Sequence, residues 1–311
     1  MSFTVIDPGM LTLLQDYGRF GHQSSGYTQG GPMDEHAFLW ANRLLHNPIN
    51  TPQLEITIGQ LVLEATSPTI IALTGADMQA KINDTPIPCW QTAELKTGDR
   101  LSFGFARDGL RTYLAVKGGF QITPVLDSVA TVCREKIGGL TQAGSRIKAG
   151  DSLPYTSYQR NKQKPQRQVP AKYQPDYSAP LELRVIEGYQ RDLFPESAVE
   201  QFYNSAYTIS QNSDRMGFRL EGPALQGGPD GVVSEGIAYG AIQIPSDGQP
   251  IILMKDRQTI GGYPKLGCIA AMDAFRLSQC RPGTAVTFIK GDIDTIRQER
   301  LAMLQFFGIN H

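Results

Sequence analysis

The chain has 311 residues, with 29 basic and 30 acidic side chains and thus almost no net charge. This length favours two domains that each bury a core, and the balanced charge argues against a nucleic-acid partner. Four scattered cysteines lack the spacing of a zinc site or a disulfide scaffold, so we expect reduced thiols. Neither a secretion signal nor a membrane-spanning apolar run is evident in the sequence, and we expect a soluble, cytoplasmic protein with no membrane partner.

Short runs of β-branched residues alternate with turns that contain glycine or proline, which is typical of a mainly β protein. In chain order, the clearest predicted strands cover residues 54–63, 69–73, 101–105, 112–116 and 181–186. Related turn-and-strand phrases at 97–101 and 282–286 indicate one β-barrel in each half, because glycine supplies the positive φ that such turns need.

Only a few helices are predicted, each from a residue suited to a helix start. Asp34 can cap a helix over residues 35–46, Pro195 suits a first helical turn, and Asp292 can cap a helix at the carboxy terminus. The last helix should bury one apolar face, formed by Ile293, Ile296, Leu301, Leu304 and Phe307.

The stretch from Pro154 to Pro180 is polar and rich in proline, and too poor in apolar residues to predict a buried element. We therefore expect one domain over residues 1–155, a linker over 156–180 and a second domain over 181–311.

The strongest functional signal follows the apolar run that begins at Ile251. Polar side chains of four chemical types stand there beside two adjacent glycines, which would let a ligand approach the backbone. A tight turn with solvated ends is the alternative, but it does not require so many polar types. The residues are Asp256, Arg257, Gln258, Thr259, Gly261, Gly262 and Tyr263.

A second cluster places Arg215 and Arg219 four residues apart. Paired arginines can clamp a phosphate or a carboxylate through bidentate hydrogen bonds, and an internal ion-pair network would have the same composition. The sequence leaves both interpretations open. If the two clusters serve one site, residues 214–219 and 256–263 must lie together.

Further charged residues stand where predicted strands end or in apolar surroundings. Asp16 and Arg19 precede a glycine-rich stretch, whereas Asp34 is better explained as a helix cap than as a catalyst. Glu55 and Glu235 have apolar neighbours, so desolvation could raise the pKa of either carboxyl. Exposure on an alternating strand is the favoured alternative for both.

Several motifs are absent from the sequence. It contains no phosphate-binding P-loop, no histidine spacing of a zinc hydrolase and no nucleophile elbow of a serine hydrolase. No metal ligands are therefore assigned.

Ordered phrases along nearly the whole chain resemble the carboxyltransferase A/B family, also described as allophanate hydrolase subunit 2. They include Gln15-Asp16-Tyr17-Gly18-Arg19, Gly30-Gly31-Pro32-Met33-Asp34, Ser213-Asp214-Arg215-Met216-Gly217, Gly240-Ala241-Ile242-Gln243-Ile244-Pro245 and Asp256-Arg257-Gln258-Thr259. The resemblance implies two cyclophilin-like β-barrel subdomains with a few short helices.

The resemblance also implies an enzyme complex, an ATP-dependent 5-oxoprolinase that converts 5-oxo-L-proline and water to L-glutamate. This chain would act only with partner subunits A and B. ATP would be the co-substrate, and it stays open whether Mg²⁺ accompanies it and which subunit holds it. Covalent biotin is not expected, because Met254-Lys255 is followed by Asp256 and not by the methionine of an attachment site.

Roles for the individual residues follow from this resemblance. The arginines at 215, 219 and 257 would hold phosphate or carboxylate, Asp256, Gln258 and Tyr263 would bind the lactam, and Glu235 or Asp16 would orient a partner group or a metal-bound water. The expected catalytic set is Asp256, Arg257, Gln258, Tyr263 and Glu235; the expected substrate- or phosphate-binding set is Asp16, Arg19, Asp34, Glu55, Arg215, Arg219, Gln243, Thr259, Gly261 and Gly262.

Two alternatives remain open. One is a carboxyltransferase component that acts on a urea-like amide with a separate biotin carrier, because urea, the ureido ring of biotin and a lactam share the N–C=O group. The other is a non-catalytic regulator that binds a kinase-inhibitor partner.

Overall fold

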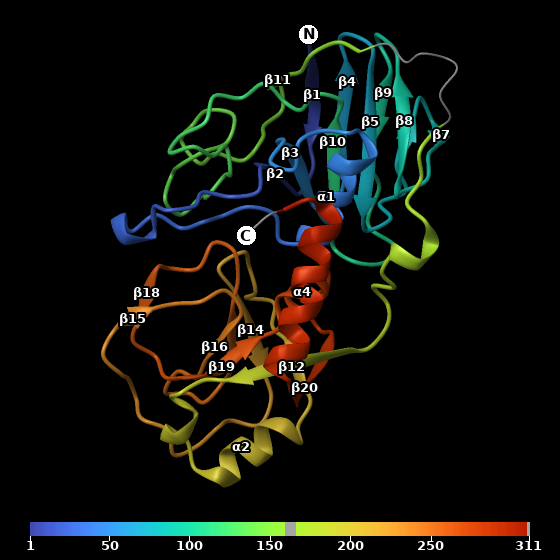
Figure 1. The fold of residues 1–311 in the computed structure, drawn as a ribbon. Helices are drawn as coiled ribbons and strands as arrows, with labels where there is room; N and C mark the ends of the chain where they lie inside the picture. The colour runs from blue at the N-terminus through green and yellow to red at the C-terminus, as the bar shows by residue number, and fades with distance from the viewer. Residues whose placement is uncertain (159–165, 310–311) are drawn as a thin grey trace. The chain divides into compact units, whose positions relative to one another are not determined.

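The computed structural model describes residues 1–158 and 166–309. Strands dominate these residues and are accompanied by four α-helices, which confirms a mainly β fold. The chain divides into two compact units (Figure 1): unit 1 contains Met1–His22 and Gln29–Ser178, and unit 2 contains Gln23–Thr28 and Ala179–His311. No helix in the described residues is long and apolar enough to cross a membrane.

Unit 1 contains two antiparallel sheets. The order of the six-stranded sheet is β11 (Ser152–Pro154), β1 (Ser2–Pro8), β4 (Leu61–Ala65), β9 (Arg100–Ser102), β6 (Lys81–Ile82) and β7 (Thr85–Pro86). The order of the five-stranded sheet is β2 (Leu11–Gln15), β3 (Gln53–Thr57), β10 (Arg111–Val116), β5 (Thr69–Gly75) and β8 (Gln91–Leu95).

The core of unit 1 takes alternate residues from both sheets, as the two-residue period of a strand requires. Phe3 and Leu63 come from the six-stranded sheet, and Leu54 and Leu114 come from the five-stranded one. The other face of the five-stranded sheet is covered by helix α1 (Glu35–Leu44), which packs on β5 and β10. Strands β3 and β10 are consequently buried on both faces.

Unit 2 is built around a closed barrel of seven strands. Their order is β12 (Leu181–Glu187), β19 (Lys265–Ile269), β16 (Ala241–Gln243), β17 (Ile251–Leu253), β14 (Gly217–Glu221), β13 (Tyr207–Ile209) and β20 (Ala285–Lys290). The parallel pairing of β12 with β20 closes the barrel, as predicted for the second half. A separate two-stranded ribbon joins β15 (Glu235–Gly236) to β18 (Ile260–Gly261).

Two predicted helix caps are confirmed. Asp34 accepts a hydrogen bond from the Ala37 N–H at 3.0 Å, and Asp292 accepts one from the Thr295 N–H at 2.8 Å at the start of α4 (Ile293–Phe307). Helix α2 (Glu196–Tyr203) follows Pro195 and packs on the barrel through Phe202, whose ring centroid lies 4.2 Å from that of Phe288. Helix α3 (Ala271–Leu277) was not predicted.

The apolar face of α4 differs from the prediction at its first residue. Ile296, Leu304 and Phe307 are buried as expected, together with Met303, but Ile293 is 58% exposed. Ile293 opens the first turn of the helix, and the apolar contacts of α4 begin only at Ile296.

The predicted linker includes residues 159–165, which lie outside the described part of the chain, but residues on both sides of them pack in unit 1. Before them, the Ser157 hydroxyl donates to the Pro68 carbonyl at 3.1 Å; after them, Val169 is buried and the Tyr173 ring lies 5.3 Å from that of Trp40. Composition indicated an unpacked segment because these apolar residues are few, yet each fills a separate place on unit 1.

Candidate functional site

The two polar clusters predicted in the second half lie together in unit 2, as expected. Strands β14 and β17 are antiparallel, and Gly217 is paired with Leu253. Beyond the paired residues, the Met254 N–H donates to the Met216 carbonyl and the Asp256 N–H donates to the Arg215 carbonyl, both at 2.8 Å. The segment before β14 is therefore fixed beside the segment after β17.

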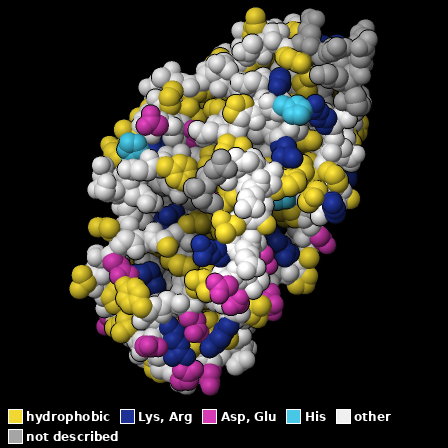
Figure 2. Space-filling view, viewed as in Figure 1, with side chains coloured by type: hydrophobic (Ala, Val, Ile, Leu, Met, Phe, Trp, Pro, Cys, Tyr) yellow, Lys and Arg dark blue, Asp and Glu magenta, His cyan; other side chains and the backbone are white. Residues whose placement is uncertain are grey.

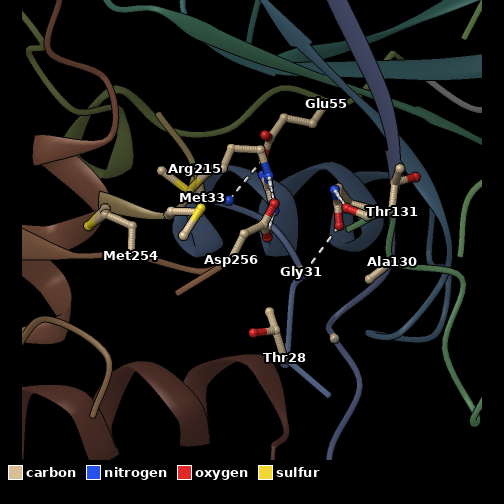
Figure 3. A network of polar contacts seen from close by, with 12 residues as sticks. Thr28, Gly31, Met33, Glu55, Ala130, Thr131, Arg215, Met254 and Asp256 are labelled. Carbon is tan, nitrogen blue, oxygen red and sulfur yellow. Dashed lines mark hydrogen bonds and ion pairs between the residues drawn. The ribbon is translucent and has the colours of Figure 1, made fainter. Parts of the chain in front are cut away.

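The side chains of Arg215 and Asp256 form a buried bidentate ion pair (Figure 3). The Nε–Oδ2 distance is 2.9 Å, the Nη2–Oδ1 distance is 2.8 Å, and each residue is 6% exposed. Arg219, four residues later, is exposed on the outer face of β14, between the buried Phe218 and Leu220. The paired arginines thus point apart, and Arg215 takes part in the internal ion pair that was one of the two interpretations.

Arg257 has a different environment, although it follows Asp256 directly. It is 6% exposed; its Nε donates to the Ile237 carbonyl at 3.0 Å and its Nη1 donates to the Met254 carbonyl at 3.2 Å. Its guanidinium carbon lies 5.8 Å from the centroid of the Tyr239 ring, and the Nζ of Lys255 lies 4.6 Å from the same centroid. Two cations therefore lie against one aromatic ring.

The backbone of Arg257 is held by a segment from the other end of the sequence. The Thr28 hydroxyl, in the short stretch Gln23–Thr28 of unit 2, donates to the Arg257 carbonyl. This contact fixes the backbone from which the Arg257 side chain extends.

Glu235 is neutralised by its neighbours. Its Oε1 lies 2.6 Å from the Nζ of Lys265 and accepts from the Gln190 amide at 2.9 Å, while its Oε2 accepts from the Tyr189 hydroxyl. Lys265, and then Tyr189, lower the pKa of Glu235. Desolvation, the less favoured of the two explanations that the sequence offered for Glu235, does not raise this pKa, because an opposite charge and hydrogen bonds to the ionised form outweigh burial.

The remaining predicted residues of this half surround the ribbon of β15 and β18. Gln243, on β16, is 1% exposed. A methyl group placed on Gly261 would lie 3.0 Å from the Gln243 Nε2 and 3.6 Å from the Gln258 Nε2, so both amides border this glycine. The Thr259 and Gly262 carbonyls accept backbone hydrogen bonds from Ile237 and Val232, and Tyr263 is 45% exposed.

In unit 1, Asp16 and Arg19 are buried and hydrogen-bonded within that unit. Asp16 accepts from the Ser128 hydroxyl at 2.6 Å and from the Val129 N–H at 2.8 Å. Arg19 is 0% exposed and donates to the carbonyls of Val125, Ser128 and Ala130. Both side chains tie the loop around Ser128 to the end of β2.

Glu55 and Asp34 belong to a second buried network of unit 1. Glu55 is 0% exposed, and its Oε2 accepts from the Met33 N–H at 2.9 Å (Figure 3) and from the Tyr113 hydroxyl at 2.7 Å. The Tyr113 oxygen in turn accepts from the Asp34 N–H at 2.8 Å, and burial raises the pKa of Tyr113 well above its usual value. The expectation that Glu55 is exposed is wrong, because Met33, just before α1, and Tyr113 of β10 lie against this side chain.

Sequence reasoning missed three polar residues that contact the predicted ones in unit 2. They are Lys265, Tyr239 and Gln190, whose Oε1 accepts from the Lys265 N–H at 2.9 Å. A signal existed only for Lys265, which follows the Gly-Gly-Tyr-Pro phrase and is the register partner of Gln243 in the pairing of β16 with β19. Tyr239 and Gln190 stand in no recognisable motif.

The surface charges and the donor groups indicate what kind of ligand this region can bind. On the face shown in Figure 2, acidic and basic side chains are interspersed over unit 2 and form no large patch of one sign. Within residues 1–158 and 166–309, no three histidine, cysteine or acidic side chains are grouped as metal ligands. The donors of this region include the two amides that border Gly261 and the guanidinium of Arg257, and such groups bind and orient carbonyl or carboxylate oxygens.

Comparison with known proteins identifies relatives that are similar to this chain in sequence. Over 304 residues, the chain is 34% identical to the C subunit of 5-oxoprolinase from Escherichia coli, and the match covers 97% of this chain and 96% of the relative. It is 32% identical to a putative urea carboxylase of Emericella nidulans, with 91% of this chain and 24% of the relative covered.

A solved structure and a family profile agree with these matches. The structure of the K. lactis urea amidolyase superposes with a TM-score of 0.89 at 28% identity, over 99% of this chain and 20% of that one. The profile for the carboxyltransferase domain, subdomain A and B, matches residues 25–290. The chain therefore belongs to the family of carboxyltransferase domains that comprise subdomains A and B.

Proposed function

We propose that this chain is one subunit of an ATP-dependent 5-oxoprolinase that is active only with two further subunits, A and B. The complex would convert 5-oxo-L-proline, ATP and water to L-glutamate, ADP and phosphate. The supporting observation is the correspondence with a relative named as the C subunit of 5-oxoprolinase, which covers 97% of this chain and 96% of the relative. The urea carboxylase relative, in contrast, extends far beyond the match.

The chemistry of unit 2 suits a binding and orienting role in this reaction. A lactam is a planar amide that water opens slowly unless its carbonyl is activated and held in position. Gln243 and Gln258 carry amide donors that border Gly261, and Arg257 carries a buried positive charge. ATP supplies the free energy for ring opening, and the residues of this chain would hold the lactam.

We place the complex in the cytoplasm, where ATP is available. All four cysteines, Cys89, Cys133, Cys268 and Cys280, are thiols and not disulfides in the structure. Reduced thiols are typical of proteins in a reducing compartment.

The test is reconstitution. The chain is purified alone, subunits A and B are purified together, and glutamate release from 5-oxo-L-proline is measured for each preparation and for the mixture. We expect glutamate only in the mixture and only with ATP. Full activity of A and B without this chain, or an inactive mixture of folded subunits, would contradict the proposal.

A carboxyltransferase that acts on a urea-like amide is the second candidate, favoured by the family profile and by the K. lactis urea amidolyase structure. Such an enzyme would need a separate biotin carrier, because Lys255 of the Met-Lys-Asp sequence is only 4% exposed and unsuited to attachment. Streptavidin blotting of the purified complex tests this: a biotinylated partner together with carboxylation of urea would replace the first proposal.

A further inference from the structure

In the described part of unit 2, Arg257 is a buried cation that contacts neutral groups. Its side chain donates to two backbone carbonyls and lies over the Tyr239 ring. Within the described residues, its guanidinium forms no ion pair, whereas Arg215 is paired with Asp256 and Lys265 with Glu235. Burying an unpaired charge is costly, so proteins rarely retain one without a compensating anion.

Loss of a proton from Arg257 does not relieve the free-energy cost of burying its charge. Burial lowers the pKa of the guanidinium, yet an arginine in a protein remains protonated near neutral pH. The charge therefore persists, and hydrogen bonds to neutral carbonyls compensate it only in part.

Gln243 contributes a second donor without a partner. It is 1% exposed, and its Nε2 finds no hydrogen-bond acceptor in the part of the chain that the structure describes. A buried amide N–H without an acceptor is destabilising, so an acceptor from a ligand would be favourable there.

Both donors adjoin the same residue, Ile237. The Ile237 carbonyl accepts from the Arg257 Nε, and a methyl group on Gly261 would lie 2.6 Å from the Ile237 Cδ1 and 3.0 Å from the Gln243 Nε2. The absence of a side chain at Gly261 therefore preserves the space beside the amide. Gly261 is required by this close approach and not by a positive φ.

We infer that Arg257 and Gln243 form an oxyanion site that binds the carboxylate group of the small-molecule substrate. A carboxylate matches the pair because one oxygen can accept from the planar guanidinium and the other from the amide. A single guanidinium and a neutral amide suit a monoanion better than a phosphate dianion. The identity of the substrate, 5-oxo-L-proline, rests on the proposed function, whereas the anion site rests on these contacts.

The three arginines to which the sequence assigned one role have different environments in the fold. Arg215 is neutralised by Asp256 and Arg219 points outward from β14, so we assign carboxylate binding to Arg257 alone. Arg219→Met is consequently a matched control, since it removes the same charge from the same unit.

The experiment is a calorimetric titration of the full chain, and of its complex with A and B, with three probes: 5-oxo-L-proline, 2-pyrrolidinone and inorganic phosphate. 2-Pyrrolidinone has the lactam ring without the carboxylate. We expect 5-oxo-L-proline to bind at least about tenfold more tightly than either other probe, from the usual strength of charge-assisted hydrogen bonds. Arg257→Met should weaken its binding about tenfold or more, and Arg219→Met should leave it unchanged.

Gly261→Ala is a second variant that leaves Arg257 in place. Its methyl group would displace the Gln243 amide, so we expect weaker 5-oxo-L-proline binding with an unchanged circular dichroism spectrum. Equal binding by Arg257→Met and Arg219→Met, tighter binding of phosphate, or equal binding of 2-pyrrolidinone would overturn the carboxylate site.

These measurements distinguish a failure of the oxyanion site from a failure of the proposed function. If the carboxylate binds through Arg257 but the complex releases no glutamate, the oxyanion site stands and the 5-oxoprolinase proposal fails. If glutamate is released and Arg257→Met changes neither binding nor the Michaelis constant for 5-oxo-L-proline, the site fails and the function stands.

Discussion

Three buried carboxylates of unit 1 are satisfied, whereas a buried guanidinium and a buried amide of unit 2 are satisfied only in part. Asp16, Asp34 and Glu55 each accept at least two hydrogen bonds from their own unit. Within the described residues, the Gln243 amide nitrogen has no acceptor, and the Arg257 guanidinium donates to two carbonyls but forms no ion pair. In sequence, both groups look alike, as polar residues near glycines. The difference indicates that the unit 1 residues hold the fold together, whereas those of unit 2 can hold a ligand.

The largest effect is expected in unit 1, at Glu55. Glu55→Ala would leave the Tyr113 hydroxyl and the Met33 N–H without their buried acceptor, so we expect a loss of about 4 kcal/mol in the free energy of unfolding. Urea denaturation followed by tryptophan fluorescence measures it, since both tryptophans, Trp40 and Trp90, lie in unit 1.

The control is Glu64→Ala, on the exposed side of β4, where a change within about 0.5 kcal/mol is expected. Equal stability of the Glu55 and Glu64 variants would show that the Glu55 network does not stabilise unit 1.

The ion pair of unit 2 should give the next largest effect. Asp256→Ala leaves the Arg215 guanidinium buried without this carboxylate, and we expect a loss of about 3 kcal/mol. The double variant Arg215→Met with Asp256→Leu removes both charges and should recover most of it. Hydrogen exchange of β14 and β17 measures both. A double variant as unstable as Asp256→Ala would mean that charge burial is not the cause.

A smaller loss is expected at Asp16. Asp16→Asn replaces one acceptor oxygen with an amide nitrogen, which cannot accept from the Ser128 hydroxyl or the Val129 N–H. We expect a loss of about 2 kcal/mol, measured by urea denaturation. Asp127→Asn, one residue before Ser128 with a fully exposed side chain, is the matched control. Equal losses in the two variants would count against a structural role for Asp16.

The smallest effect should depend on pH. Hydrogen bonds from the Thr295 hydroxyl and N–H lower the pKa of Asp292 below its ordinary value of 3.8. A lowered folded-state pKa stabilises the protein at pH values above the ordinary one, and this stabilisation is lost as the pH falls through the lowered value. Melting temperatures of the wild type and Asp292→Ala should therefore differ at about pH 7 and converge towards about pH 2. A difference that persists unchanged in acid would exclude the carboxylate as its source.

Local features of the fold could be predicted from the sequence. Asp34 and Asp292 cap helices as expected, because a cap depends on residues within one turn of it. The strands around Leu114 and Leu183 also follow from short-range alternation, whereas the single strand predicted over residues 54–63 is two strands, β3 and β4. The adjacency of the segments near Arg215 and Asp256 follows from their shared position at the ends of paired strands.

Features set by distant residues could not be predicted. Glu55 looked exposed because alternation describes only one face of a sheet, and α1 covers the other face. The lowered pKa of Glu235 could not be foreseen either, because Lys265 lies against it only in the fold. Arg215 finds its carboxylate 41 residues away, so the spacing to Arg219 carried no information about its partner.

The segment Gln23–Thr28 belongs to unit 2, although the residues on both sides of it in the sequence belong to unit 1. A backbone cut between residues 158 and 166 would leave an amino-terminal fragment that still supplies residues 23–28 to unit 2, and a carboxy-terminal fragment that still supplies residues 166–178 to unit 1. Each fragment would thus complete the other's fold, and the nicked pieces should co-elute until denatured. Each unit contains a segment from the other half of the sequence, so neither half of the chain is a module that can be transplanted alone.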